Sequence, residues 1–229
     1  GNIDEEYIKK SWKISKIENF KKMERSRFNI IRSFHPDEEN ILKSISNMNP
    51  SRFDFNPHFF EYPSFYIYLV ALTLKIFSIL KVIYITSDIT FYFKNPSEIA
   101  KFYLIGRCLT LIFGILTLFF LSRISEKIKK GTYLMTFLIL LLNPLFAINS
   151  HYMTVDIPMI FWMTLFLYFL IKYYETSKPI FFYLSSISIG FATGTKYPAL
   201  INWFLIPYVF ILLKYPLKEI FKKNLISFL

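Results

Sequence analysis

The chain has 229 residues, of which 54% are hydrophobic, 20% are aromatic and 6 are glycine, so a disordered or collagen-like chain is excluded. Its 27 basic and 16 acidic residues give a net charge of +11, which in a soluble protein would suggest nucleic acid as a partner. Here the basic residues cluster between long apolar runs, for example at 122–130 and 214–223. This pattern is typical of a multi-span membrane protein, and we expect no nucleic-acid binding.

The chain divides into three parts by composition. Residues 1–34 form a basic, polar N-terminal segment without an apolar core, and residues 35–98 form a predicted outer loop with interfacial or re-entrant helices. Residues 99–229 are expected to form a transmembrane bundle of about five spans, truncated at the C-terminus. The predicted spans are 99–121, 132–149, 157–174, 180–193 and 199–213. A full crossing needs about 20 residues, so the last two read as a broken or hairpin pair.

The stretch 64–93 is long enough to cross a membrane but carries Lys75 and Lys81. If the basic loop 122–130 is cytoplasmic, the span 99–121 enters from outside, and the stretch before it must begin and end on the outer side. We therefore expect interfacial or re-entrant helix, with the lysines snorkelling to the lipid headgroups. The acidic segment 35–62 then also lies outside, opposite the basic loops.

Acidic side chains mark three places on this outer side. Asp37 and Glu38 follow a His-Pro pair, although Asp37 could simply cap the next helix. Glu61 lies in an aromatic, proline-rich approach to the stretch 64–93, which could be a membrane-interface aromatic belt. Asp156 lies between two strong spans and could likewise cap the helix that follows.

Two cations lie within apolar segments. Lys196 falls between the last two predicted spans and Arg107 lies inside the span 99–121, and such costly positions suggest functional counter-charges. Snorkelling is the structural alternative. His35, His58 and His151 all fall near acids in predicted outer loops, so a divalent cation could bind there, but their spacing is not a zinc signature and no cofactor is assigned.

Together these residues resemble the glycosyltransferase C (GT-C) superfamily, specifically the group of protein O-mannosyltransferases and lipid A aminoarabinose transferases. The matching motifs in chain order are Asp37-Glu38, Glu61-Tyr62-Pro63, Gly106-Arg107, Thr154-Val155-Asp156-Ile157-Pro158, and Gly190 with Gly194-Thr195-Lys196. The resemblance implies an all-α, polytopic membrane bundle of GT-C type with interfacial helices in the first outer loop. Members begin with a span ahead of the acidic pair, so the chain reads as an N-terminal part lacking that span.

The resemblance also implies an activity, namely transfer of mannose or a similar sugar from a polyprenyl-phosphate donor to a protein, lipid or glycan acceptor. Transfer would proceed with inversion at the extracytoplasmic face, in a multi-pass protein of a prokaryotic plasma membrane. The implied roles are Asp37 as general base, Glu38 as the group that orients either the acceptor or Asp37 itself, and Asp156 as a second acid near the sugar. Lys196 and Arg107 would bind the donor phosphate, and Glu61, His58 and His151 would be weaker acceptor or metal contacts.

Two other classes of function stay open at this point. A non-catalytic polyprenyl-phosphate-binding or accessory membrane protein would keep the fold without turnover. A secondary transporter would use Arg107 and Lys196 for an anionic solute, but it predicts inverted repeats, which we do not see between the two halves of the sequence.

Overall fold

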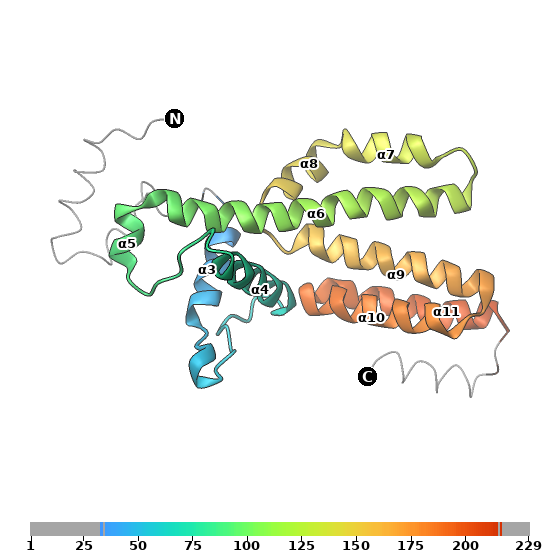
Figure 1. Ribbon diagram of the computed structural model, residues 1–229. Coiled ribbons are helices and arrows are strands. Elements are labelled where there is room, and N and C mark those ends of the chain that lie inside the picture. The colour runs from blue at the N-terminus through green and yellow to red at the C-terminus, as the bar shows by residue number, and fades with distance from the viewer. Residues whose placement is uncertain (1–32, 34, 215, 217–229) are drawn as a thin grey trace.

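The computed structural model describes residues 33, 35–214 and 216, and their regular structure is helical (Figure 1). The predicted N-terminal segment 1–34 lies almost wholly outside these residues. The elements are α3 (Pro36–Asn47), η1 (Pro50–Arg52), α4 (Phe65–Ile79), α5 (Ile89–Lys94), α6 (Pro96–Ile128), α7 (Tyr133–Leu141), α8 (Pro144–His151), α9 (Asp156–Thr176), α10 (Pro179–Thr195), η2 (Tyr197–Phe204) and α11 (Leu205–Leu212). The fold is an all-α membrane helical bundle.

Two of the described helices, α6 with 33 residues and α9 with 21, are long and apolar enough to cross a membrane. The pair α7 and α8 makes a third candidate if it counts as one span, but it is bent by 65°. The bend has a local cause, because Pro144 begins α8 and the Asn143 side chain caps it by accepting from the Phe146 N–H at 3.0 Å. The sequence prediction of one continuous span over 132–149 missed this break.

The helices after α9 reverse at Lys196. α10 ends at Thr195, and the chain returns through the 3₁₀ segment η2 and the short helix α11, each of 8 residues. Pro198 lies in the first turn of η2, where its missing N–H is tolerated. The predicted spans 180–193 and 199–213 therefore correspond to a helical hairpin whose second arm is broken.

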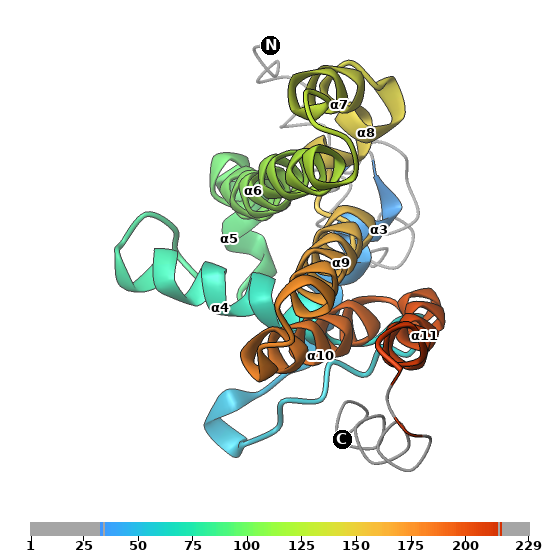
Figure 2. The ribbon, with the colours of Figure 1, turned by 90° about the vertical axis from the view of Figure 1, so that its right-hand side faces the viewer.

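Helix α4 lies crosswise to the bundle. Figure 2 shows the long helices nearly end-on, with α4 running across them. Its buried residues include Tyr66, Val70 and Leu74, spaced one helical turn apart, while Leu72 and Ile76 are exposed on other faces. The chain then reverses at Lys81, which adopts a left-handed backbone conformation with φ of 60°. The stretch 64–93 thus contains the 15-residue helix α4, a turn and most of α5, and the interfacial position of these helices stays a prediction.

Two clusters of buried apolar side chains hold the bundle together, and α9 contributes to both. One joins α3, α4, α6 and the start of α9, and the other joins the end of α9 to α10, η2 and α11. Glycine allows α6 to approach the segment before α9 closely, because a Cβ on Gly106 would lie 2.0 Å from Met153 Sδ. At Gly114 a Cβ would lie 2.9 Å from Ser150 Oγ. This close packing fixes the segment 150–155 beside α6.

The two ends of the bundle differ in chemistry. We call the end where α8 and α10 finish and α9 begins the α3 end, because α3 lies there (Figure 1). At the opposite end, Lys127 and Glu175 form an ion pair at 2.5 Å, and Arg123 stacks over the rings of Phe119 and Tyr133. The ion pair joins the basic segment 122–130, which the charge pattern predicts to be cytoplasmic, to the C-terminal end of α9.

Candidate active site

Glu38 joins three segments at the α3 end. Its side chain is fully buried and accepts hydrogen bonds from Arg107 Nε at 2.8 Å and from Arg107 Nη2 at 2.7 Å. The backbone N–H of Met153 donates to the same carboxylate at 2.8 Å, and the Ser33 hydroxyl donates to its other oxygen. One carboxylate therefore connects α3, α6 and the segment before α9.

The Glu38 carboxyl is held in its charged form. Burial alone would raise the pKa of this carboxyl. The net pKa nevertheless lies below its usual value of 4.5, because the carboxylate accepts hydrogen bonds from Arg107, the Met153 N–H and Ser33 and lies beside the guanidinium charge. The Arg107 guanidinium also lies over the Tyr152 ring at 5.6 Å. Because this carboxylate is charged and bonded on both oxygens, it is suited to hold α3 in place and is a poor proton acceptor.

Asp37 lies beside this anchor, in the first turn of α3. Its backbone N–H donates to His35 Nδ1 at 3.3 Å, so His35 is the N-cap and the capping role considered for Asp37 is wrong. Its half-buried carboxylate makes no hydrogen bond or ion pair with the part of the chain that the structure describes. A carboxylate without a protein partner is available to a ligand.

Asp156 and Lys196 form the second ion pair at this end. Lys196 Nζ lies 2.6 Å from Asp156 Oδ1, and the side chains are 34% and 38% exposed. Asp156 is the first residue of α9, and Lys196 is the C-cap residue of α10. The structure therefore brings two of the predicted site residues together from segments 40 residues apart.

Tyr62 is a residue that the sequence analysis did not single out for chemistry. Its hydroxyl is buried and has no hydrogen-bond partner among the described residues. Burial raises its pKa, and the negative charges of Asp37, Glu61 and Asp156 raise it further. Three predicted acids from separate segments therefore act electrostatically on one hydroxyl. The sequence signal that could have found it is its place between Glu61 and Pro63 in the motif.

The histidines do not form a metal site. His58 adopts a φ of 49° and lies 3.9 Å from Asp54, and exposed His151 is bonded through Nδ1 to the Ala147 carbonyl at 2.6 Å. His35 stacks on Tyr152 with ring centroids 4.8 Å apart. Across residues 33, 35–214 and 216, no group of three or more His, Cys, Asp or Glu side chains is arranged to hold a metal ion.

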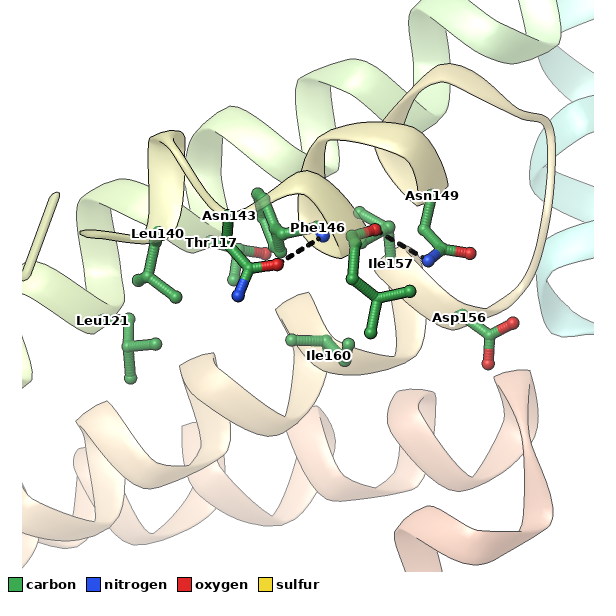
Figure 3. Close-up of a pocket in the computed structure, with 10 residues that line it drawn as sticks. Thr117, Leu121, Leu140, Asn143, Phe146, Asn149, Asp156, Ile157 and Ile160 are labelled. Carbon is green, nitrogen blue, oxygen red and sulfur yellow. Dashed lines mark hydrogen bonds between the residues drawn. The ribbon is translucent and has the colours of Figure 1, made fainter. Parts of the chain in front are cut away.

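A pocket of about 520 Å³ lies between α6, the bent pair α7–α8 and α9 (Figure 3). Its lining is mainly apolar, with Leu121, Leu140 and Ile160 among the residues drawn. Asn143 and Asn149 contribute amides from the bent pair, and Asp156 lies at one end of the pocket. The pocket is therefore mainly apolar and has the Asp156 carboxylate, the ion-pair partner of Lys196, at one end.

One comparison with known proteins names a family. Residues 55–228 match the family described as dolichyl-phosphate-mannose-protein mannosyltransferase, a region that begins after the acidic pair of α3. An uncharacterized protein of Aquifex aeolicus (strain VF5) is 35% identical over 113 residues, which make up 48% of this chain and 21% of that protein. The chain thus covers about a fifth of that relative's length. No solved structure matches this chain. Since the family match covers most of its length, the chain belongs to the dolichyl-phosphate-mannose-protein mannosyltransferase family.

Proposed function

We propose that this protein is a membrane glycosyltransferase that transfers mannose or a similar hexose from a polyprenyl-phosphate donor to a hydroxyl-bearing acceptor. The acceptor is a protein, lipid or glycan, and transfer takes place at the extracytoplasmic face of a multi-pass protein in a prokaryotic plasma membrane. The observation that carries the proposal is Asp37. Its carboxylate has no partner in the described part of the chain, and it stands next to the buried Glu38–Arg107 anchor in a member of this family.

Lys196 is the proposed ligand of the donor phosphate. Its ammonium has one ion-pair partner, Asp156, and is 34% exposed, so a phosphate can replace or join that carboxylate. The pocket beside Asp156 is apolar enough to take part of the prenyl chain. Arg107 can bind the phosphate only through Nη1, because its Nε and Nη2 already donate hydrogen bonds to Glu38.

The proposed reaction is a single displacement at the anomeric carbon. Asp37 takes the proton of the acceptor hydroxyl as the oxygen attacks that carbon from the face opposite the phosphate. The bond from the carbon to the phosphate oxygen breaks with its electron pair on the phosphate, whose charge Lys196 stabilises. Glu38 acts by holding Asp37 in position, and Asp156 lies near the sugar. The product has the inverted configuration.

Replacing Asp37 tests this function. We expect Asp37→Asn to abolish transfer of labelled mannose from dolichyl-phosphate mannose to hydroxyl acceptors in a membrane extract, because an amide cannot accept the proton. Donor binding should stay as in the wild type. Asp88→Asn is the matched control, since Asp88 caps α5 and asparagine caps a helix equally well.

Three outcomes of this experiment separate the possible functions. Normal turnover by Asp37→Asn would remove Asp37 from the role of base. A wild-type chain that binds the donor lipid and never transfers the sugar would favour the alternative, a non-catalytic lipid-binding or accessory protein. A wild-type chain that binds no donor would contradict the proposal as a whole.

A further inference from the structure

Tyr62 carries a hydroxyl that the fold itself does not use. Its ring packs edge-on against Phe59, with centroids 4.6 Å apart, and the residue is 9% exposed. In the residues that the structure covers, the hydroxyl meets no hydrogen-bond partner. The next tyrosine along the chain differs, since the Tyr66 hydroxyl bonds Thr110 Oγ1 at 2.6 Å. A buried polar group without a partner is rare enough to require an explanation, and one explanation is an absent ligand.

The charges near the Tyr62 hydroxyl indicate what kind of ligand could bind there. Asp37, Glu61 and Asp156 each place negative charge near Tyr62. An anion would be repelled by these carboxylates, whereas a neutral group with several hydroxyls could donate to them. The same group could accept from the phenolic O–H, which remains protonated because burial and these charges raise its pKa.

We propose that the Tyr62 hydroxyl contacts the substrate and donates a hydrogen bond to an oxygen of the sugar carried by the donor lipid. This inference rests on the proposed function, because it needs a lipid-linked sugar at the site. The sugar is joined directly to the phosphate that we assign to Lys196, and Lys196 is bonded to Asp156, one of the acids around Tyr62. Asp37, the proposed base at the anomeric carbon, is a second acid whose charge acts on Tyr62.

Two lipids that differ only in the sugar test the inference. The detergent-purified chain is titrated with dolichyl-phosphate mannose and with dolichyl phosphate. We expect Tyr62→Phe to weaken binding of the mannose lipid about threefold to tenfold, the range for loss of one neutral hydrogen bond. Its affinity for dolichyl phosphate and its melting temperature should not fall, because the protein loses no internal hydrogen bond.

Tyr66→Phe is the matched control, because it removes a buried phenolic hydroxyl that does have a partner, Thr110. It should lower the melting temperature and leave the ratio of the two lipid affinities unchanged. Lys196→Ala should weaken both lipids together, since both carry the phosphate. The three variants therefore separate contacts to the sugar, to the phosphate and to the fold.

The remaining outcomes overturn the inference. Equal binding of the mannose lipid by Tyr62→Phe and wild type would show that the hydroxyl does not contact the sugar. If Tyr62→Phe weakened both lipids equally, the hydroxyl would contact a part that both lipids share and not the sugar. If Tyr62→Phe lowered the melting temperature, the hydroxyl would have a hydrogen-bond partner within the protein. A wild-type chain that binds neither lipid would contradict the proposed function itself and this inference with it.

Discussion

Two ion pairs join distant segments at the α3 end, and their acids differ in burial and in the number of bonds they accept. The cations Arg107 and Lys196 are both about a third exposed. Glu38 is fully buried and is bonded to Arg107 through both oxygens, with the Met153 N–H and Ser33 as further donors. Asp156 and Lys196 share a single contact at 2.6 Å and are about a third exposed. The first pair is built to hold the segments together, and the second can open for a ligand at little cost to stability.

Removing Arg107 should have the largest effect. Arg107→Met leaves the buried Glu38 carboxylate without its cation, and we expect the free energy of unfolding to fall by about 3 kcal/mol, with loss of transfer. Denaturant or thermal unfolding in detergent measures this loss. The double variant Glu38→Leu with Arg107→Met should recover much of the stability without recovering transfer. Full stability of Arg107→Met alone would remove the distinction between the two pairs.

Filling the close contact between α6 and Met153 should have the next largest effect. A Cβ at Gly106 meets the buried Met153 side chain, so Gly106→Ala should displace the segment whose N–H bonds Glu38 and cost about 2 kcal/mol. Gly190→Ala is the control, because its Cβ would meet no described atom outside its own stretch of helix within 4 Å and alanine favours the helix by about 0.5–1 kcal/mol. Unfolding of the two variants side by side measures the difference, and equal stability would contradict it.

Lys196→Ala should leave the fold nearly unchanged. The pair it breaks is about a third exposed and stabilises by about 1 kcal/mol or less. Binding of the donor lipid should weaken about tenfold or more, as expected for loss of a charge-assisted hydrogen bond to phosphate. Direct binding of radiolabelled dolichyl-phosphate mannose measures it. If Lys196→Ala bound the donor lipid as tightly as the wild type, Lys196 would not bind the phosphate and snorkelling would explain its position.

A pH titration should give the smallest effect. The folded-state pKa of Glu38 lies below its usual value of 4.5, so its contribution to stability is present above that pH and is lost as the pH falls through the lowered pKa. The wild-type melting temperature should therefore drop more steeply in acid than that of Glu38→Gln. Parallel curves for the two proteins would show that the carboxylate contributes nothing through its charge.

Much of the fold was predictable from the sequence, because long apolar runs separated by basic loops determine a membrane bundle. The bend between α7 and α8 was missed, since Asn143 and Pro144 lie inside one apolar run and hydropathy alone does not register the break. That 64–93 forms no long spanning helix was predictable, because Lys75 and Lys81 conflict with a crossing.

The candidate site was only partly predictable. Motif order identified Glu38, Arg107, Asp156 and Lys196 as separate polar residues, but not which acid pairs with which cation. Glu38 and Arg107 are 69 residues apart, and no local pattern encodes a contact at that distance. Tyr62 was missed because its significance depends on acids brought to it by other segments.

The bend between α7 and α8 has a consequence for how a ligand reaches the pocket. The nine residues of α7 extend about 14 Å, roughly half the hydrocarbon thickness of a bilayer. A helix of this length that starts at one membrane surface ends near the middle of the hydrocarbon layer, so we expect the pocket wall at this bend to face acyl chains. We expect its occupant to arrive sideways from the surrounding acyl chains, so access should depend on the lipid composition of the membrane and not on diffusion through the aqueous phase.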